Sequence, residues 1–305
     1  MEILVFGAGS LGSLVGGLLA REHDVSLVGR DPHATAVNDD GLRITGVESV
    51  DVRPAATTDA TGTSADLALV TVKTYDTEAA ARTLATGDYD AVCSLQNGMG
   101  NEDVLADTVD ASVLAGTATY GARLVDPGHV EWTGRGTITV GAWRPVDDAT
   151  TADRVAAAFR AAGLDAAATA DIRTRLWEKL AVNAAINPVT ALSRVENGAL
   201  TERPLAALAR PAAVETAAVA RAAGTDLDDG TARDAAETVA RETARNRSSM
   251  LQDVTRGRRT EIDAINGYVV DRAAATGTSA PVNRTLADLI RGWEAGVGVR
   301  PPGHE

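Results

Sequence analysis

The sequence predicts an α/β protein with two domains: an N-terminal Rossmann doubly wound sheet and a C-terminal domain that is entirely helical. Three observations support this prediction. A glycine-rich turn joins the first apolar strand to a helix, strands and helices then alternate to about residue 113, and almost every segment beyond residue 151 has helical periodicity. Because 305 residues are long for one hydrophobic core, we expect residues 1–168 to form the first domain and residues 169–305 the second.

The first half of the chain alternates between strand and helix patterns. Residues 2–6 and 24–28 are short apolar runs, and the apolar residues between them recur at helical spacing, which gives a βαβ unit. Further strands are predicted at 66–72 and 90–95, with helices at about 76–85 and 101–107. Residues 113–140 are β-rich and interrupted by turns at 126–128 and 134–136, so antiparallel hairpins should finish the sheet.

The second half is dominated by alanine-rich helical segments. A first helix is predicted at about 152–162 and is followed by a last strand at 164–168. Further periodic segments predict helices at about 173–191, 205–223, 231–246 and 261–275. Residues 296–305 are expected to form a loose tail.

The charge composition excludes two classes of partner. The net charge of −13 repels nucleic acid and anionic membranes, and the short basic run Arg256-Gly257-Arg258-Arg259 is interpreted as a solvated turn. The acidity and the scarcity of lysine resemble the proteins of salt-loving organisms. We therefore expect a small-molecule substrate, and the sequence leaves a homodimer open.

The single cysteine and the absence of targeting signals favour a cytoplasmic protein. Cys93 has no partner for an internal disulfide and lies in a predicted strand, which favours a buried, inert thiol over a nucleophile. The apolar start of the chain is itself a strand, and no apolar run approaches the roughly 20 residues that span a bilayer.

The glycine-rich turn predicts a dinucleotide site. A pyrophosphate lies on a helix N-terminus when the backbone comes close to it, which requires glycines, and a further glycine lets the helix pack on the strand. Because this turn follows a strand and opens a helix within a βαβ unit, dinucleotide binding is favoured over an ordinary glycine-rich turn. The residues concerned are Gly7, Ala8, Gly9, Ser10, Leu11 and Gly12.

The end of the second strand bears on which dinucleotide is bound. A cation at this position suits the extra phosphate of NADP, whereas an acid suits the ribose hydroxyls of NAD. Arg30 comes first and favours NADPH, but Asp31 follows it and leaves NADH open. A surface arginine without a ligand is the alternative.

Lysine occurs only at Lys73 and Lys179. A buried lysine can give up a proton near neutral pH, whereas a guanidinium group stays protonated. Lys179, Asn183 and Asn187 are spaced by four residues, so they line one face of a helix, and their neighbours are apolar enough that the helix should be largely buried. Unpaired amides there would cost about 1–3 kcal/mol each, so a ligand, water or protein contacts should satisfy them.

Residues 246–266 hold a further polar group. Thr260 and Asp263 have the spacing of a reciprocal helix cap, which would make Glu261 an ordinary acid of the first turn. The spacing alone does not separate this interpretation from a functional one.

Motifs in the same order along the chain resemble those of the ketopantoate reductase family. They are Gly7-x-Gly9-x-x-Gly12, Val72-Lys73, Gln96-Asn97-Gly98-Met99-Gly100, Lys179 to Asn183, Ile186-Asn187-Pro188, Asn197-Gly198, Ser248-Ser249-Met250-Leu251-Gln252-Asp253 and Thr260-Glu261-Ile262-Asp263 with Ile265-Asn266-Gly267.

The resemblance implies reduction of 2-dehydropantoate to (R)-pantoate by NADPH, a step toward pantothenate and coenzyme A. It implies that Lys179 is the proton donor and that Glu261 acts near both substrate and cofactor. The residues implied to hold the substrate are Asn183, Asn187, Asn197 and Ser249, beside Lys179. Those implied to border the cofactor are Arg30, Lys73, Asn97, Ala122 and Glu261, beside the glycine-rich turn.

Two other functions stay open at this point. One is a reductase of another small 2-oxo acid or a dehydrogenase of a 3-hydroxy acid on the same scaffold, and the other is a non-catalytic NADP-binding sensor. Because the glycine-rich turn and the Lys179 helix belong to different predicted domains, we expect the site in a cleft between them. No metal is expected.

Overall fold

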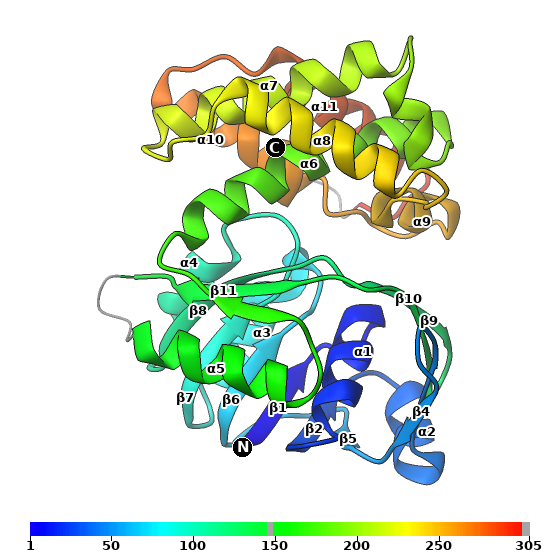
Figure 1. Cartoon of the computed structure of the whole chain (residues 1–305), viewed down its shortest axis with the longest axis vertical. Coiled ribbons are helices and arrows are strands. Elements are labelled where there is room, and N and C mark those ends of the chain that lie inside the picture. Colours follow the sequence, from blue (N-terminus) through cyan, green and yellow to red (C-terminus); the bar gives the residue numbers. More distant parts are fainter. Residues whose placement is uncertain (145–148, 301–305) are drawn as a thin grey trace. The chain divides into compact units, whose positions relative to one another are not determined.

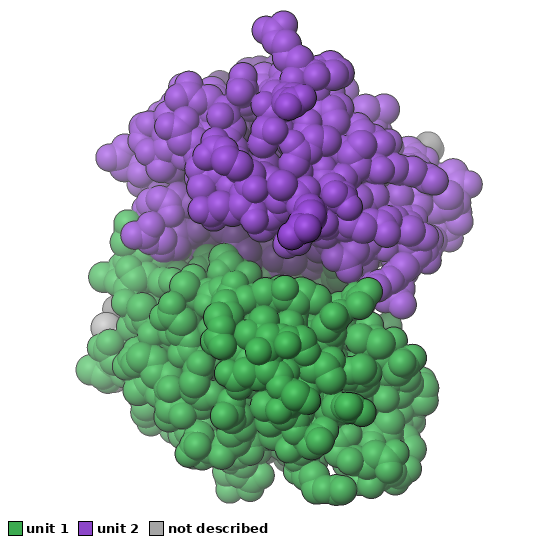
Figure 2. All heavy atoms as spheres, turned by 45° about the vertical axis from the view of Figure 1, so that its right-hand side comes forward, with its two compact units in different colours: residues 1–96, 101–172 green, residues 97–100, 173–305 purple. Residues whose placement is uncertain are grey.

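The computed structural model describes residues 1–144 and 149–300 of the chain. It divides into two compact units (Figure 2): residues 1–96 with 101–172, and residues 97–100 with 173–305. The units part between Ile172 and Arg173, and the short segment 97–100 packs with the second unit. No helix of the described part of the chain is long and apolar enough to span a membrane.

The first unit is built on an eight-stranded sheet (Figure 1) with the order β12-β11-β8-β7-β6-β1-β2-β5. The six strands from β8 to β5 are parallel, β11 runs antiparallel to β8, and β12 is parallel to β11. The strands are β1 Glu2–Phe6, β2 Asp24–Val28, β5 Ala55–Thr57, β6 Ala65–Val70, β7 Tyr89–Ser94, β8 Ser112–Ala118, β11 Ile138–Ala142 and β12 Ala166–Ala168. Since the chain reverses its direction of progress between β1 and β6, the carboxyl ends of these two strands form the switch point where doubly wound sheets bind ligands.

A second sheet corrects the prediction that hairpins within residues 113–140 finish the main sheet. β8 and β11 do extend it, but the hairpin of β9 (Gly121–Asp126) and β10 (His129–Gly134) joins a separate sheet of order β4-β3-β10-β9. β10 pairs in parallel with β3 (Leu42–Gly46), which in turn pairs with β4 (Val50–Val52). The β9–β10 hairpin joins two consecutive segments and was predicted. Its pairing with β3, which lies far away in the sequence, was not predicted.

Helix α1 (Ser10–Leu19) packs between the two sheets, touching β1 and β2 on one side and β3, β9 and β10 on the other. Adjacent glycines make this close approach feasible. A Cβ on Gly16 would lie 2.5 Å from Leu27 of the main sheet, and one on Gly17 would lie 2.8 Å from Leu42 of the second sheet. The second sheet is thereby fixed beside the helix that opens at the glycine-rich turn.

The remaining helices of the first unit follow strands of the main sheet. They are α2 His33–Asp40, η1 Thr74–Asp76, α3 Thr77–Leu84, α4 Asn101–Ala106 and α5 Ala149–Ala161. α5 packs on β11 and β12 and lies across the face of the sheet that is turned to the viewer in Figure 1. α2 was not predicted, because its alternating polar residues show no clear apolar stripe.

The second unit is helical in its described residues. Its elements are α6 Ile172–Ser193, η2 Asn197–Thr201, α7 Ala206–Ala222, α8 Asp229–Glu242, α9 Ser249–Thr255, the π-helical turn η3 Asp263–Gly267, α10 Tyr268–Thr276 and α11 Pro281–Gly296. α6, α7, α8 and α10 correspond to predicted helices, while α11 was not predicted.

The expectation of a loose tail over residues 296–305 is wrong for Arg300. Its guanidinium donates to Glu294 Oε2 at 2.8 Å and to Asp263 Oδ1 at 3.0 Å. Both carboxylates lie in other elements, so the sequence alone does not show them as partners. Residues 301–305 lie outside the described chain.

Cys93 lies on β7 and is fully buried. Burial raises the pKa of its thiol, and the nearby negative charge of Glu102 raises it further. Because the thiolate is the reactive form, we expect no labelling of the native chain by 5,5′-dithiobis(2-nitrobenzoate) and one equivalent after unfolding in denaturant. Stoichiometric labelling of the folded chain within minutes would contradict the buried position.

Candidate active site

The glycine-rich turn forms a cradle at the carboxyl end of β1. Gly7 has a φ of +118°, and a Cβ there would lie 2.7 Å from the backbone nitrogen of Val72, while one on Gly12 would lie 2.2 Å from the carbonyl oxygen of Gly7. Gly9 differs, since a Cβ there would meet only the Gly7 carbonyl, at 4.0 Å. The outer two glycines are required by the fold itself, and Gly9 leaves room above the N-terminus of α1. The cradle therefore fits a dinucleotide pyrophosphate.

The second sheet borders this cradle. The backbone N–H of Leu124 donates to Ser10 Oγ at 3.0 Å, which fastens β9 to the first turn of α1. Ala122 lies on the same strand and is partly buried against the core of the unit. Ala122 therefore lies on the strand that is fastened to α1, and only the resemblance singled it out.

His33 is a positioning residue that the sequence did not reveal. Its Nδ1 accepts the backbone N–H of Gly128 at 3.0 Å, and its Nε2 lies 3.0 Å from Ser13 Oγ on α1. Since Nδ1 accepts, the proton of the neutral ring is on Nε2, which donates to Ser13. Burial lowers the pKa of His33, so the neutral ring links α1, α2 and the β9–β10 turn at neutral pH.

Arg30 and Asp31 have different surroundings at the carboxyl end of β2. The Arg30 side chain is 90% exposed and forms an ion pair with Asp76 at 3.3 Å. Asp31 Oδ1 instead accepts hydrogen bonds from the Thr35 backbone N–H at 3.2 Å and from its hydroxyl at 2.8 Å. One oxygen of the Asp31 carboxylate is thus engaged at the start of α2, whereas the guanidinium of Arg30 is presented to solvent.

Lys73 lies just beyond the carboxyl end of β6, and the side chain of Gln96 holds the loop that carries it. Gln96 Nε2 donates to the Val72 carbonyl at 3.1 Å and to Thr77 Oγ1 at 2.7 Å. Thr77 in turn donates to Asn101 Oδ1 at 2.8 Å. The sequence predicted Lys73 but assigned no role to Gln96, whose contacts depend on the pairing of β6 with β7.

The segment that contains Asn97 packs against the start of η3 in the second unit. The Met99 N–H donates to the Ala264 carbonyl at 3.1 Å. A Cβ on Gly98 would lie only 2.6 Å from the same carbonyl, and Gly98 has a φ of +74°. The structure thereby brings the Asn97 segment to the turn that follows Glu261, a residue that is only 6% exposed.

Helix α6 carries Lys179, Asn183 and Asn187, as predicted from their spacing. Asn187 is only 5% exposed, and Asn183 is half-buried. Within residues 1–144 and 149–300, the structure gives neither side-chain amide a hydrogen-bond partner. The Trp177 ring of the same helix packs on Tyr268 at a centroid distance of 5.8 Å, next to the segment of Asn97. The α6 face therefore offers amide groups to a ligand.

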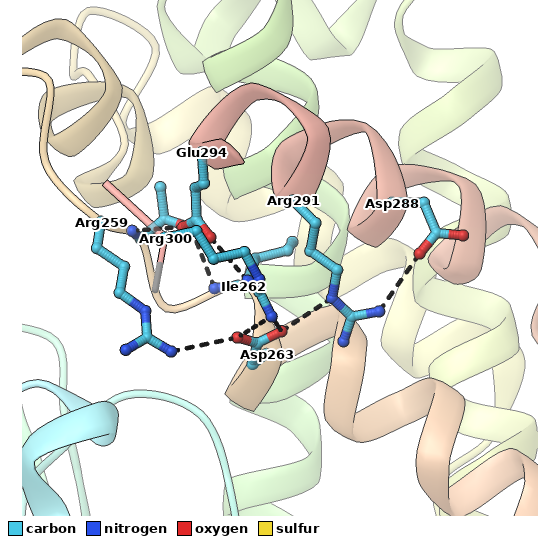
Figure 3. Close-up of polar contacts among 8 residues, drawn as sticks. Arg259, Ile262, Asp263, Asp288, Arg291, Glu294 and Arg300 are labelled. Carbon is cyan, nitrogen blue, oxygen red and sulfur yellow. Dashed lines mark hydrogen bonds and ion pairs between the residues drawn. The ribbon is translucent and has the colours of Figure 1, made fainter. Parts of the chain in front are cut away.

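The reciprocal cap considered for Thr260 and Asp263 does not form. The backbone N–H and the hydroxyl of Thr260 both donate to Glu294 Oε1 at 2.7 Å. Asp263 instead lies among Arg259, Arg291 and Arg300 (Figure 3), with Arg291 Nε 2.9 Å from its Oδ1. The solvated turn expected at 256–259 is accordingly wrong for Arg259, which pairs with Asp263. Glu261 is therefore not the first-turn acid of a helix capped by Thr260 and Asp263.

The arginines around Asp263 make the stability of the second unit depend on pH. Burial would raise the pKa of Asp263, but its hydrogen bonds from Arg300 and Arg291 and their charges hold it below the ordinary 3.8. A lowered folded-state pKa stabilises the fold above pH 3.8, and this stabilisation is lost as pH falls through the folded-state pKa. We expect Asp263→Asn to lower Tm by roughly 2–8 °C at pH 7, with the difference shrinking below pH 4.

Asp288→Asn is the matched control for that measurement. Asp288 also pairs with Arg291, at 3.3 Å, but its side chain is 61% exposed, so its removal should change Tm little. Equal Tm losses in the two variants, or a loss in Asp263→Asn that does not vary with pH, would contradict the assignment.

Ser248 and Ser249 have separate positions at the start of α9. Ser248 caps the helix, since its Oγ accepts the Leu251 N–H at 3.1 Å, and it also lies 2.7 Å from Thr190 Oγ1 of α6. Ser249, the residue predicted to bind substrate, is exposed at the first helical position.

Asn197 lies on η2 and is largely buried. Its Nδ2 donates to Thr243 Oγ1 at 2.8 Å, and its N–H donates to the Asn246 carbonyl at 3.0 Å. These contacts hold η2 at the end of α8. One hydrogen of the Asn197 side-chain amide is already engaged by Thr243.

Comparisons with known proteins agree over nearly the whole chain. Residues 3–145 match the family described as ketopantoate reductase PanE/ApbA, and residues 171–294 match its C-terminal part. A 2-dehydropantoate 2-reductase of Halobacterium salinarum is 45% identical over 299 residues, covering 95% of this chain and 98% of its own.

Two solved structures are also similar. A PanE/ApbA family ketopantoate reductase from Ralstonia eutropha has a TM-score of 0.88 at 35% identity, covering 98% of this chain and 100% of its own. The ternary structure of D-mandelate dehydrogenase with NADH and anilino(oxo)acetate has a TM-score of 0.92 at 24% identity, covering 98% of this chain and 100% of its own. The latter likeness is one of fold.

Proposed function

The chain belongs to the ketopantoate reductase family, and we propose that it reduces 2-dehydropantoate to (R)-pantoate with NADPH as the hydride donor. The observation that carries the proposal is the α6 face, where Asn183 and Asn187 have no amide partner among the described residues and lie on the face of Lys179. Asn187 is only 5% exposed, but its amide atoms are not among the fully buried ones without a partner, so they are open to a hydrogen bond with a bound ligand.

The chemistry of a 2-oxo acid suits these side chains. A reduced nicotinamide supplies hydride to the carbonyl carbon, and negative charge then builds on the carbonyl oxygen. An ammonium group beside that oxygen stabilises the charge and gives it a proton, which is the role proposed for Lys179. Asn183, Asn187, Asn197 and Ser249 offer neutral donors and acceptors to the substrate carboxylate and hydroxyl, without adding charge.

Glu261 is proposed to act beside Lys179. Its position at the turn that packs on the Asn97 segment supports a place near both substrate and nicotinamide. A carboxylate is an acceptor, so it suits a hydroxyl of the substrate.

NADPH is preferred over NADH because of the contrast between Arg30 and Asp31. The exposed guanidinium of Arg30 can form charge-assisted hydrogen bonds to a ribose phosphate, while Asp31 already accepts two hydrogen bonds from Thr35. Lys73 and the glycine-rich turn are proposed to border the same cofactor.

The deciding experiment is steady-state reduction of ketopantoate by NADPH and by NADH, at low and at molar salt. We expect the highest kcat/KM with ketopantoate and NADPH. Branched 2-oxo acids without the terminal hydroxyl serve as comparison substrates, because they keep the reacting group. Equal kcat/KM for these acids would favour the alternative, a reductase of another small 2-oxo acid, and absence of turnover with every one would contradict the proposal.

A further inference from the structure

Helix α6 contains a gap in its backbone hydrogen bonding. Pro188 lies inside the helix and has no N–H, so the carbonyl of Ala184, four residues earlier, lacks its helical donor. Ala184 is fully buried, so this carbonyl is not satisfied by bulk water. Ala184 directly follows Asn183, on the stretch that carries the proposed substrate ligands.

The missing donor comes from another element. Asn266, in η3, is fully buried, and its Nδ2 donates to the Ala184 carbonyl at 3.0 Å. The side-chain amide thus replaces the backbone N–H that Pro188 lacks. It also fixes η3 against α6 at the level of Asn183.

The orientation of the Asn266 amide is set by its neighbours. Asn283 Nδ2 donates to the Ala212 carbonyl at 3.0 Å and to Glu215 Oε2 at 2.9 Å, which leaves Asn283 Oδ1 as the acceptor facing Asn266, at 2.9 Å. Glu215 also accepts the backbone N–H groups of Val282 and Asn283, each at 3.0 Å. Both hydrogens of the Asn266 amide are therefore directed by the network, one to Asn283 and one to Ala184.

Stability alone does not account for this arrangement. Asn266 Oδ1 is buried and has no hydrogen-bond partner in the part of the chain that the structure describes. A buried acceptor without a partner costs about 1–3 kcal/mol. An alanine at position 188 would close the gap in α6 with a backbone N–H and would not require a buried amide.

Asn266 also connects to the other half of the proposed site. It lies in the same turn as Ala264, whose carbonyl accepts the Met99 N–H of the Asn97 segment. The turn follows directly on Glu261 and Ile262, and the carbonyl of Glu261 accepts the N–H groups of Ala264 and Ile265 at 3.1 Å. One side chain therefore joins the turn that follows Glu261 to the helix of Lys179 and Asn183.

We propose that Asn266 is a positioning residue for substrate reduction: its bond to the Ala184 carbonyl sets α6 in register with the turn of Glu261. The inference rests on the proposed function for the roles of Lys179, Asn183 and Glu261. Misplacing reacting groups by about 1 Å can cost a factor of about 100 in rate. The effect should fall on substrate turnover, because Asn266 contacts α6, the helix that carries the proposed substrate-binding residues.

Restoring the backbone donor provides the test. We expect Asn266→Ala to lower kcat/KM for the 2-oxo acid roughly 10- to 100-fold, with the Kd for NADPH within about twofold of wild type. In Pro188→Ala/Asn266→Ala the N–H of residue 188 can reach the Ala184 carbonyl, so kcat/KM should rise about fivefold or more above that of Asn266→Ala. Tm, measured in parallel, separates positioning from loss of folded chain.

Pro211→Ala is the matched control, because Pro211 is also inside a helix of the second unit. The carbonyl it deprives of a donor belongs to Ala207, which is exposed. Pro211→Ala should leave kcat/KM unchanged, and Pro211→Ala/Asn266→Ala should not recover activity. Recovery in both double variants would show general helix stabilisation and would overturn the inference, as would no recovery with Pro188→Ala.

If Asn266→Ala does not fold, Pro188→Ala/Asn266→Ala should still fold and stay within about tenfold of Pro188→Ala in kcat/KM; a double variant that also fails to fold overturns the inference. A wild-type chain that reduces no 2-oxo acid contradicts the proposed function itself. An active wild type with an unaffected Asn266→Ala contradicts only the inference.

Discussion

Replacing Lys179 by alanine is expected to lower kcat for ketopantoate reduction by a factor of about 10²–10⁴, the usual contribution of a positioned general acid. The alkoxide that forms on hydride addition would then lose both its nearest positive charge and its proton source. The glycine-rich turn belongs to the other unit and keeps its contacts, so the Kd for NADPH should stay within about twofold.

Two further variants define what the lysine contributes. Lys179→Arg keeps the positive charge but not a proton that leaves near neutral pH, so its kcat should stay far below that of the wild type. Arg175→Ala removes a basic side chain from the same helix that is 56% exposed and paired with Glu178, and it should leave kcat unchanged. An Lys179→Ala variant that keeps wild-type kcat would refute the assignment and favour the non-catalytic sensor.

The parts of the fold that depend on local sequence could be predicted. The strand before Gly7 and the helix that begins at Ser10 follow from apolar spacing and from glycines that the structure shows to be sterically required. The α6 face of Lys179, Asn183 and Asn187 follows from helical periodicity alone.

The parts that depend on distant partners could not. β3 pairs with β10, which lies more than eighty residues later, and no local pattern shows that pairing. Thr260 has the spacing of a helix cap, yet its hydroxyl donates to Glu294, because that carboxylate is fully buried and needs donors. Likewise, Pro188 is visible in the sequence as a break in α6, but only the fold shows that Asn266 closes it.

Hydrogen bonding also distinguishes two residues that the sequence could not separate. Arg30 and Asp31 are adjacent, and either could bind the cofactor ribose: the cation its phosphate, or the acid its hydroxyls. The structure shows that the Asp31 carboxylate accepts two hydrogen bonds from Thr35, while the Arg30 side chain is 90% exposed. This contrast, which depends on α2, is the basis for the second large expected effect.

Replacing Arg30 by alanine is expected to raise KM for NADPH about 10- to 100-fold and to change KM for NADH less than about twofold. The magnitude corresponds to loss of a charge-assisted hydrogen bond to phosphate, about 1.5–3 kcal/mol, at about 1.4 kcal/mol for each factor of ten. The ion pair between Arg30 and Asp76 is exposed, so its loss should change stability little. Steady-state kinetics with each cofactor, at saturating ketopantoate, measure both values.

A control must separate phosphate recognition from a general loss of positive charge in an acidic chain. Arg82→Ala also removes an exposed arginine from the first unit, one that is 69% exposed and paired with Glu78 at 3.6 Å. It should change KM for NADPH and NADH alike and only slightly, because a distant surface charge is screened by salt. Asp31→Ala should weaken the start of α2 without reversing the cofactor preference. If Arg30→Ala weakened both cofactors equally, Arg30 would not read the phosphate, and the preference for NADPH would have to come from Lys73 or another residue of the cradle.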